Sequence, residues 1–379
     1  MGIGLYIHVP FCIRKCRYCA FTSYPVNEGE VFNYIDALSR EIGIRAGMLS
    51  PEERKVDTVY MGGGTPTCLP VKVLGTLFET VYSHFDVSHD AEISVEANPG
   101  TVDGYKLAVL GEHGVNRISI GIQACQPELL HVLGRIHSFE EAVNSFNQAR
   151  DRGFDNINVD LIFGIPGQSF EQWRECLNRV AGLMPDHISA YGLHLEEGTP
   201  LFESAEKGRV EPCPEDLEAD MYKYLVDCLK SRGYVHYEIS NFALPGRLCR
   251  HNLRYWLNRD YLGLGPAAHS FMAGRRFSNE PLLRRYADKL SAGVLPECRE
   301  EEMDLENEMS ETVFLGLRLV EGLDRGEFRE RFGKSVEEVY GAQIKHLAGL
   351  GLIEADERRI RLTEKGLLLG NIVFAEFVS

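Results

Sequence analysis

Over its first two-thirds, the chain alternates short apolar, β-rich runs with longer stretches of helical character. The apolar runs lie at residues 5–9, 57–61, 92–96, 117–120, 156–163 and 187–191. Helix-like segments, such as residues 31–48, 71–82 and 139–150, separate them. A strand followed by a helix, repeated in this way, predicts βαβ units around a parallel sheet. A (β/α) barrel and a doubly wound sheet both satisfy this order.

The ends of the apolar runs favour the barrel, because nearly all of them carry chemically distinctive residues. These are cysteines after the first run, residues 62–67 after the second, Glu96 at the third, Gln123 after the fourth, Asp160 within the fifth and residues 192–194 after the sixth. Groups from many strand ends converge on one face of a barrel. An open sheet collects them at a switch point that fewer strands reach.

After about residue 200 the regular alternation ends. Residues 212–232 predict a helix, an aromatic and glycine-rich tract follows at 234–271, and an acidic run lies at 299–311. The chain closes with a helix leading into a β-hairpin, which resembles a winged helix. Its charge is mixed, so a structural cap is favoured over DNA binding. We expect a barrel at 1–210, an extension and linker at 211–300, and a mainly helical, winged-helix-like domain at 301–379.

Composition excludes several classes of protein. The 379 residues carry a formal net charge of −16, which argues against a broad electrostatic grip on nucleic acid or anionic lipid. No stretch approaches the roughly 18 apolar residues that a membrane span needs. The first ten residues lack the basic and apolar regions of a signal peptide. We therefore expect a cytoplasmic protein whose ten cysteines are reduced.

Three of these cysteines form the motif Cys12-x-x-x-Cys16-x-x-Cys19, whereas the other seven are scattered. Thiolates are the usual ligands of iron–sulfur clusters, and most cubane clusters take four of them. Three thiolates from one loop could hold a cube and leave one iron open to a substrate. A zinc site or three incidental cysteines are the alternatives, although zinc favours paired C-x2-C spacing.

A glycine run, Gly62-Gly63-Gly64-Thr65-Pro66-Thr67, follows the second predicted strand. Such a run lets the backbone approach a ligand closely, although an ordinary βα turn is the alternative. Together with the cysteine loop it resembles the radical S-adenosylmethionine (SAM) superfamily. That resemblance implies a [4Fe-4S] cluster, whose open iron chelates the amino and carboxylate groups of SAM, and a partial (β/α)6 TIM-like barrel.

Further segments resemble the oxygen-independent coproporphyrinogen III oxidase group within this superfamily. They are residues 6–12, 94–99, 117–123, 134–135 and 158–166. The resemblance implies that Cys12, Cys16 and Cys19 hold the cluster. The residues that it assigns to cofactor binding are Tyr6, Tyr18, Gly63, Gly64, Thr65, Glu96, Gln123, Arg135 and Asp160.

The side chains at three of these positions suit SAM. Glu96 can accept from an ammonium group, Arg135 can pair with a carboxylate, and Asp160 can accept from ribose hydroxyls. The structural alternatives are an ion pair between Glu96 and Arg135 and a helix-capping role for Asp160.

Two departures from the oxidase pattern point to a sister branch. Ala20 and Phe21 follow Cys19 where the oxidase continues to a fourth cysteine, and the first cysteine comes after only eleven residues. Both features resemble the HemW-type haem chaperones.

A third feature, His251-Asn252-Leu253-Arg254-Tyr255-Trp256, matches the H-N-x-x-Y-W signature of that branch. The resemblance implies that His251, Asn252, Tyr255 and Trp256 take part in haem binding. Imidazole is a normal axial ligand of haem iron, and aromatic rings can contact a macrocycle. Arg250 or Arg254 could meet a propionate, and Cys249 could offer a thiolate. The structural alternative places His251 and Asn252 in loop hydrogen bonds and Trp256 in the core.

The resemblance implies a haem chaperone, leaning away from an enzyme, that binds haem, a [4Fe-4S] cluster and SAM. It would pass haem to an unidentified acceptor protein, which can be membrane-associated, and would bind no nucleic acid. The alternatives are a radical SAM coproporphyrinogen III oxidase and a radical SAM enzyme for an unrelated substrate. The acceptor, cleavage of SAM and oligomeric state are not indicated by the sequence.

Overall fold

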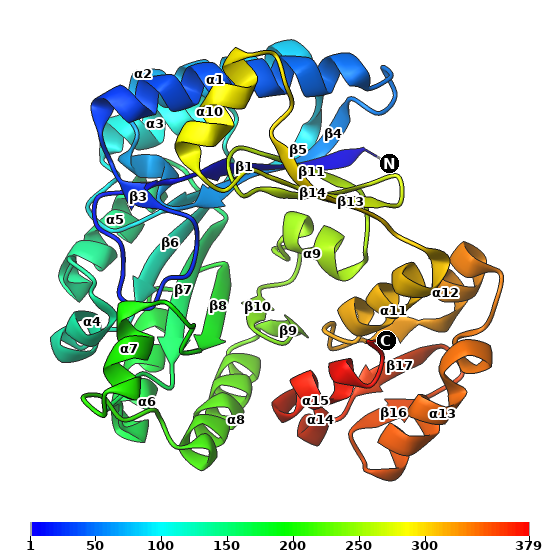
Figure 1. The fold of residues 1–379 in the computed structure, drawn as a ribbon. Coiled ribbons are helices and arrows are strands. Elements are labelled where there is room, and N and C mark those ends of the chain that lie inside the picture. Colours follow the sequence, from blue (N-terminus) through cyan, green and yellow to red (C-terminus); the bar gives the residue numbers. More distant parts are fainter. Residues whose placement is uncertain (1, 379) are drawn as a thin grey trace.

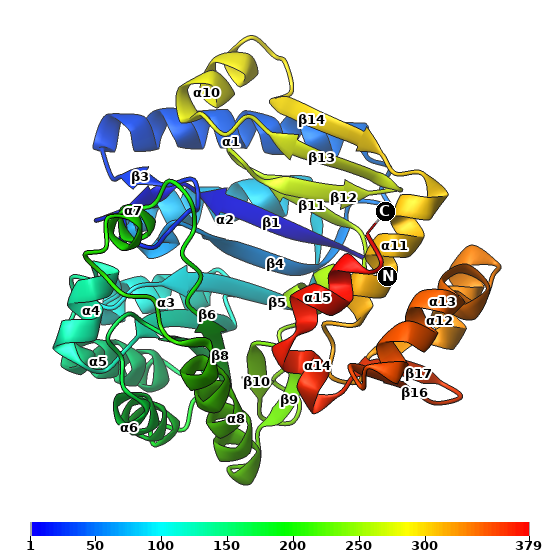
Figure 2. The same ribbon diagram turned by 60° about the horizontal axis from the view of Figure 1, so that its bottom comes forward.

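The computed structural model describes residues 2–378, which form one large curved sheet wrapped by helices and a smaller C-terminal unit (Figures 1 and 2). Six strands of the sheet are parallel neighbours in the order β1-β4-β5-β6-β7-β8. Their bounds are β1 (Ile3–Val9), β4 (Lys55–Gly63), β5 (Asp86–Ala97), β6 (Arg117–Gln123), β7 (Ile157–Phe163) and β8 (His187–Gly192). The six predicted apolar runs are these strands, and the expected partial (β/α)6 barrel is confirmed.

Helices cover the convex face of this sheet (Figure 2). They are α1 (Glu28–Met48), α2 (Val71–His84), α3 (Gly104–Glu112), α4 (Pro127–Leu133), α5 (Phe139–Asp151), α6 (Phe170–Ala181) and α8 (Glu215–Ser231). Their apolar faces pack on strand residues such as Leu5, Ile7 and Val95, which are fully buried. Short connections include η1 (Pro66–Cys68) and α7 (Pro200–Glu206).

Residues beyond 210 extend the sheet at both edges. The strands β10 (Asn241–Ala243) and β9 (Val235–Glu238) follow β8 at one edge. At the other edge, β11 (Tyr261–Leu264) pairs in parallel with β1, and β12 (His269–Met272), β13 (Arg275–Asn279) and β14 (Glu297–Glu302) follow. The sheet therefore runs across the expected boundaries at 210 and 300, and the segment between them is more than a linker.

Two helices of this segment lie on opposite sides of the sheet. The helix α10 (Leu283–Ser291) packs on α1 outside it, whereas α9 (Arg250–Trp256) lies on the concave side (Figure 1). The position of α9 brings the H-N-x-x-Y-W segment into the interior of the partial barrel.

The C-terminal unit has its own hydrophobic core, which includes Val313, Phe328, Leu347 and Val373. Its helices are α11 (Leu305–Gly316), α12 (Arg325–Phe332), α13 (Val336–Gly349), α14 (Glu364–Leu368) and α15 (Gly370–Ala375). A small sheet of β15 (Leu323–Asp324), β16 (Ile353–Ala355) and β17 (Arg359–Leu362) completes it. The hairpin β16–β17 follows α13, as expected for a winged-helix-like unit. No helix within residues 2–378 is both long and apolar enough to cross a membrane.

Candidate cofactor site

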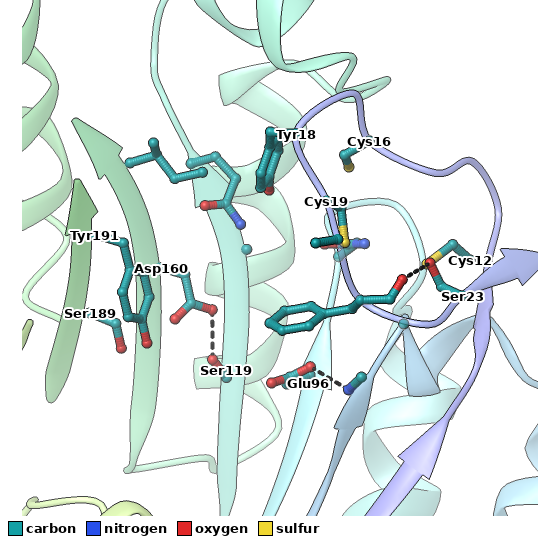
Figure 3. A pocket seen from close by; sticks show the side chains of 18 of the residues that line it. Cys12, Cys16, Tyr18, Cys19, Ser23, Glu96, Ser119, Asp160, Ser189 and Tyr191 are labelled. Carbon is teal, nitrogen blue, oxygen red and sulfur yellow. Dashed lines mark hydrogen bonds between the residues drawn. The ribbon is translucent and has the colours of Figure 1, made fainter. Parts of the chain in front are cut away.

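A cavity of about 450 Å³ opens on the concave side of the sheet, among the ends of its parallel strands. The cysteine loop lies on one side of it, and Asp160, Ser189 and Tyr191 lie on strands at the other (Figure 3). Of the residues predicted to bind the cluster and SAM, those that line this cavity are Cys12, Cys16, Tyr18, Cys19, Gly63, Gly64, Glu96, Gln123, Arg135 and Asp160.

The cysteine loop is held at its base by the short pair of strands β2 (Phe11–Cys12) and β3 (Tyr24–Pro25). Cys12 is buried, and Cys16 and Cys19 are half-buried. Burial raises the pKa of the Cys12 and Cys19 thiols. In the described part of the chain, no three His, Cys, Asp or Glu side chains close around a point where one metal ion would fit. Three thiols that share one cavity wall suit the larger cubane cluster.

Arg135 and Thr65 supply hydrogen bonds to the cysteine sulfurs. The Nη1 atom of Arg135 lies 3.4 Å from the Sγ atom of Cys16, and the Thr65 hydroxyl lies 3.6 Å from the Sγ atom of Cys12. Thr65 does not line the cavity itself. It is 1% exposed and accepts a hydrogen bond from Asn98, so its place is behind the cysteines.

The glycine run passes directly beneath the loop. The backbone N–H of Gly64 donates to the carbonyl of Val9, and a Cβ atom on Gly64 would lie 2.5 Å from the carbonyl oxygen of Phe11. Gly63 has a φ of +107°, and a Cβ atom there would overlap the His8 ring. Both positions therefore require glycine to bring this turn against the cysteine loop.

Two buried carboxyl groups lie on adjacent parts of the cavity wall. Glu96 accepts from the Tyr60 hydroxyl at 2.8 Å and from the Gly63 N–H at 3.1 Å. Burial, together with the nearby Asp160, raises the pKa of Glu96 to about 7. Asp160 accepts from Ser119 at 2.8 Å and from Asn158 at 2.9 Å, and burial raises its pKa as well.

Across the residues that it describes, the structure contains neither the ion pair between Glu96 and Arg135 nor the helix-capping role considered for Asp160. Arg135 donates to Asn98 at 2.6 Å and to the Gly121 carbonyl at 2.7 Å. Glu96 accepts from Tyr60 and Gly63, and no ion pair with Arg135 is found among the described residues. Asp160 lies inside β7, so it caps no helix. Both carboxylates remain available to a ligand in the cavity.

Tyr6 differs in position from the other predicted SAM residues. Its side chain lines a second cavity, and its hydroxyl lies 3.0 Å from the Nδ1 atom of His8. A direct contact between Tyr6 and SAM would therefore have to reach across the boundary between the two cavities.

The residues of the H-N-x-x-Y-W segment are likewise divided between the two cavities. Asn252 lines the first cavity, whereas Tyr255 and Trp256 line the second. His251 is fully buried, with its Nδ1 atom 2.9 Å from the Thr58 hydroxyl and its Nε2 atom 2.8 Å from the Tyr255 hydroxyl. Burial, reinforced by the charge of Arg117, lowers the pKa of His251 to about 3. In this arrangement neither ring nitrogen is open to haem iron.

The residues near this segment that were considered for haem have structural partners. Cys249 is buried, and its Sγ atom lies 3.5 Å from the Oε1 atom of Glu92. Arg250 donates to the carbonyl of Asp90, and Arg254 forms an ion pair with Asp57. The structure thus gives these three residues roles that fix α9 to the sheet.

Sequence reasoning missed several residues of the first cavity. Arg117 is 1% exposed, and its Nε atom has no hydrogen-bond partner. Other missed lining residues are Tyr60, Asn98, Ser119, Asn158, Ser189 and Tyr191. Ser119 and Asn158 stand out in the sequence as polar positions in otherwise apolar strands, which is the signal that could have identified them.

The parallel partial barrel, the three-cysteine loop and the glycine turn together define a radical SAM protein. Residues 6–180 match the Radical SAM superfamily, and residues 303–369 match the HemN C-terminal domain. Heme chaperone HemW of Bacillus subtilis is 37% identical over 375 residues, covering 99% of this chain and 98% of that protein. The chain belongs to the HemW family of the radical SAM superfamily.

Two other relatives agree with this assignment. Heme chaperone HemW of Escherichia coli is 34% identical and covers 100% of this chain and 98% of that protein. The solved structure of coproporphyrinogen III oxidase (HemN) from Escherichia coli superposes with a TM-score of 0.87 at 26% identity, covering 99% of this chain and 90% of that one. Membership of the superfamily implies a [4Fe-4S] cluster and SAM, and the donor set of the first cavity fits both.

Proposed function

We propose that this protein is a haem chaperone, which binds haem together with a [4Fe-4S] cluster and SAM and passes haem to an acceptor protein. The observation that carries the proposal is full-length similarity to proteins named heme chaperones, at 37% identity over 99% of the chain. Similarity that spans both the barrel and the C-terminal unit supports a shared activity more strongly than similarity of the barrel alone.

Within this proposal, Cys12, Cys16 and Cys19 hold the cluster, and SAM binds in the first cavity. The predicted cofactor residues that line it are Tyr18, Gly63, Gly64, Glu96, Gln123, Arg135 and Asp160. Glu96 accepts from the ammonium group of SAM, Arg135 meets its carboxylate, and Asp160 meets ribose hydroxyls. When bound, the cluster supplies an open iron and an electron donor. The acceptor protein is unidentified, and the −16 charge of the chain favours an acceptor with basic groups at the contact.

The second candidate is an oxygen-independent coproporphyrinogen III oxidase. The superposition on the Escherichia coli oxidase favours it, because the fold agrees over 99% of this chain. The cysteine loop favours the chaperone, since Ala20 and Phe21 take the place of the oxidase's fourth cysteine. The Phe21 side chain is 67% exposed.

One sample can decide between the two candidates. The chain is reconstituted anaerobically with iron and sulfide, its iron content is measured, and it is then titrated with haem and assayed with coproporphyrinogen III, SAM and a reductant. Near-stoichiometric haem uptake with a Soret shift, without conversion of the porphyrinogen, is the expected result. Formation of protoporphyrinogen would establish the oxidase, and absence of both haem uptake and conversion would overturn both candidates.

A further inference from the structure

Arg117 places a positive charge at the floor of the first cavity, the end that lies away from the cysteine loop. It is the first residue of β6, and Arg117, Ser119, Gly121 and Gln123 line the cavity in turn along that strand. The side chain is 1% exposed. Its Nε atom has no hydrogen-bond partner, and no ion pair of its guanidinium is found among the described residues. A buried charge without direct partners is costly, so its presence calls for an explanation.

The strand register places Arg117 beneath the two buried carboxyl groups of the cavity. On β5, Arg117 pairs with Ser94, two residues before Glu96, so Glu96 lies one inward-facing layer above it. On β7, Asp160 pairs with Gly121 and lies two layers above Arg117. Successive layers are about 7 Å apart, because every second residue of a strand faces the same side. The guanidinium therefore faces the cavity from below the carboxyl groups, at a range over which charges shift each other's ionisation.

Few permanent positive charges balance these carboxyl groups. In the part of the chain that the structure describes, the first cavity is lined by two arginines, Arg117 and Arg135, and by no lysine. Arg135 is engaged at the cysteine loop, where it donates to Cys16, Asn98 and the Gly121 carbonyl. Arg117 is the arginine that these partners leave to act on the carboxyl groups.

The electrostatics of Glu96 agree with this geometry. Burial raises the pKa of Glu96 to about 7 and raises that of Asp160 as well, and the charge of Arg117 opposes both rises. Four phenols also surround Glu96, and burial raises the pKa of each, so they are neutral at physiological pH. They are Tyr6, Tyr60, Tyr191 and Tyr255.

On its other side, Arg117 has one acidic neighbour. This is Glu92, on β5, which accepts from the backbone N–H groups of Arg250 and His251. Burial shifts the pKa of the remaining titratable neighbours in the direction that keeps them neutral. They are His187, Tyr237, Cys249 and His251. Arg117 thus balances Glu92 on one side and the cavity carboxyl groups on the other.

Resting on SAM binding in the proposed function, we propose that Arg117 is a positioning residue of the SAM site. Its buried charge holds Glu96 and Asp160 in the carboxylate form that the ammonium group and ribose hydroxyls of SAM require. It acts through these two side chains and makes no contact with SAM. This role accounts for a buried guanidinium that has no direct partner.

Four variants test the role. Arg117→Gln and Arg117→Met remove the charge, and both should fold because no ion pair and no Nε hydrogen bond is lost. Arg117→Lys keeps the charge and should restore wild-type behaviour. Arg174→Gln, on the exposed face of α6, removes a charge far from the cavity and is the matched control.

SAM binding is measured by equilibrium dialysis of the reconstituted variants between about pH 6 and about pH 8.5. Without the Arg117 charge, Glu96 should hold its proton to higher pH. Both neutral variants should therefore bind SAM about three- to tenfold more weakly at pH 7, and their affinity should level off about half to one pH unit later. Arg117→Lys and Arg174→Gln should follow the wild-type profile.

A second measurement needs no SAM. The infrared carboxyl band that disappears in Glu96→Gln is titrated in each apo chain, and its midpoint should move upwards by the same amount in the two neutral variants alone. A wild-type midpoint and profile in both neutral variants would overturn the proposal. An equal loss of affinity at every pH would assign a direct contact with SAM instead.

Two further outcomes are distinguishable from these. If both neutral variants failed to fold while Arg117→Lys folded, the charge would serve folding and the proposed role would be wrong. If the wild-type chain bound no SAM at any pH, the proposed function would fail, whereas the infrared titration would still report whether Arg117 controls the ionisation of Glu96.

Discussion

Arg135 donates a hydrogen bond from Nη1 to the Sγ atom of Cys16, 3.4 Å away, while its Nη2 atom is fixed by Asn98 and the carbonyl of Gly121. The guanidinium thus links Cys16, a predicted cluster ligand, to two strand ends of the barrel. Its position follows from the end of α4 at Leu133. The next residue, Gly134, caps the helix in the left-handed conformation, with φ of 74°, and Arg135 comes directly after it. If Cys16 holds the cluster and Arg135 meets SAM, as proposed, this one residue would contact both cofactors.

Arg135→Gln should weaken SAM binding roughly 10- to 100-fold, because a charge-assisted hydrogen bond is worth about 1.5–3 kcal/mol. Equilibrium dialysis of the reconstituted chain against labelled SAM measures the change. Arg174→Gln, on the exposed face of α6, is the control and should leave SAM affinity unaltered. Equal affinity in Arg135→Gln and the wild type would rule out a contact between Arg135 and SAM.

Replacing any one cysteine of the loop with alanine should abolish stable cluster uptake, because only two thiolates would remain to hold the cluster. The variants are Cys12→Ala, Cys16→Ala and Cys19→Ala. Iron and sulfide analysis after anaerobic reconstitution checks this. Cys68→Ala is the matched control, since Cys68 lies next to the loop with its Sγ atom 3.5 Å from the Phe11 carbonyl oxygen. Loss of iron in Cys68→Ala, with retention in any loop variant, would contradict the three-cysteine site.

SAM affinity should rise with pH up to about 7 and then level off. Burial raises the pKa of Glu96 to about 7, so the carboxyl group is largely protonated below that pH. The ammonium group of SAM favours the ionised form, and binding below pH 7 must expel the proton. This costs up to about tenfold in affinity per pH unit. Glu96→Gln should bind SAM more weakly and show a flatter profile; a parallel rise in both chains would exclude Glu96 as the titrating group.

Gly64→Ala should impair both folding and cluster uptake. The added Cβ atom would lie 2.5 Å from the Phe11 carbonyl oxygen, so the glycine turn would be pushed away from the residue preceding Cys12. The expected cost is about 1–3 kcal/mol in the free energy of unfolding. Gly111→Ala, in α3 with open space around it, should be neutral or slightly stabilising. Urea unfolding of both apo variants, followed by iron analysis, measures the difference.

His251→Phe should destabilise the apo chain by about 1–3 kcal/mol. The substitution leaves the buried hydroxyl of Thr58, and that of Tyr255, without their present partner. His89→Phe, at an exposed position of β5, should change stability by less than about 0.5 kcal/mol. Equal stability of the two variants in urea unfolding would show that the His251 hydrogen bonds contribute nothing.

The parallel strands could be predicted from sequence because each one is followed by its own helix. Local periodicity carries that information. Strand-end chemistry in the sequence singled out Glu96, Gln123 and Asp160, and all three line the first cavity. Pairing between β1 and β11 could not be predicted in this way. Gly4 pairs with Tyr261 across more than 250 residues of chain, and no local pattern encodes such a partner.

The candidate site was predictable to the extent that it lies on strand ends and in the cysteine loop. The position of His251 was not predictable, because the motif gives the residue types but not the direction in which α9 lies. That helix turns His251 against Thr58 and presents Tyr255 and Trp256 to the second cavity. The assignment of these residues to haem stays a prediction.

Completion of the sheet by later strands means that the amino-terminal part is not a separable module. A fragment ending near residue 210 would leave β1 without β11 and β8 without β10. Two rows of unpaired backbone N–H and C=O groups would then face solvent, a configuration prone to aggregation. An expressed fragment should therefore retain the chain at least through β14, even when only the cluster chemistry is of interest.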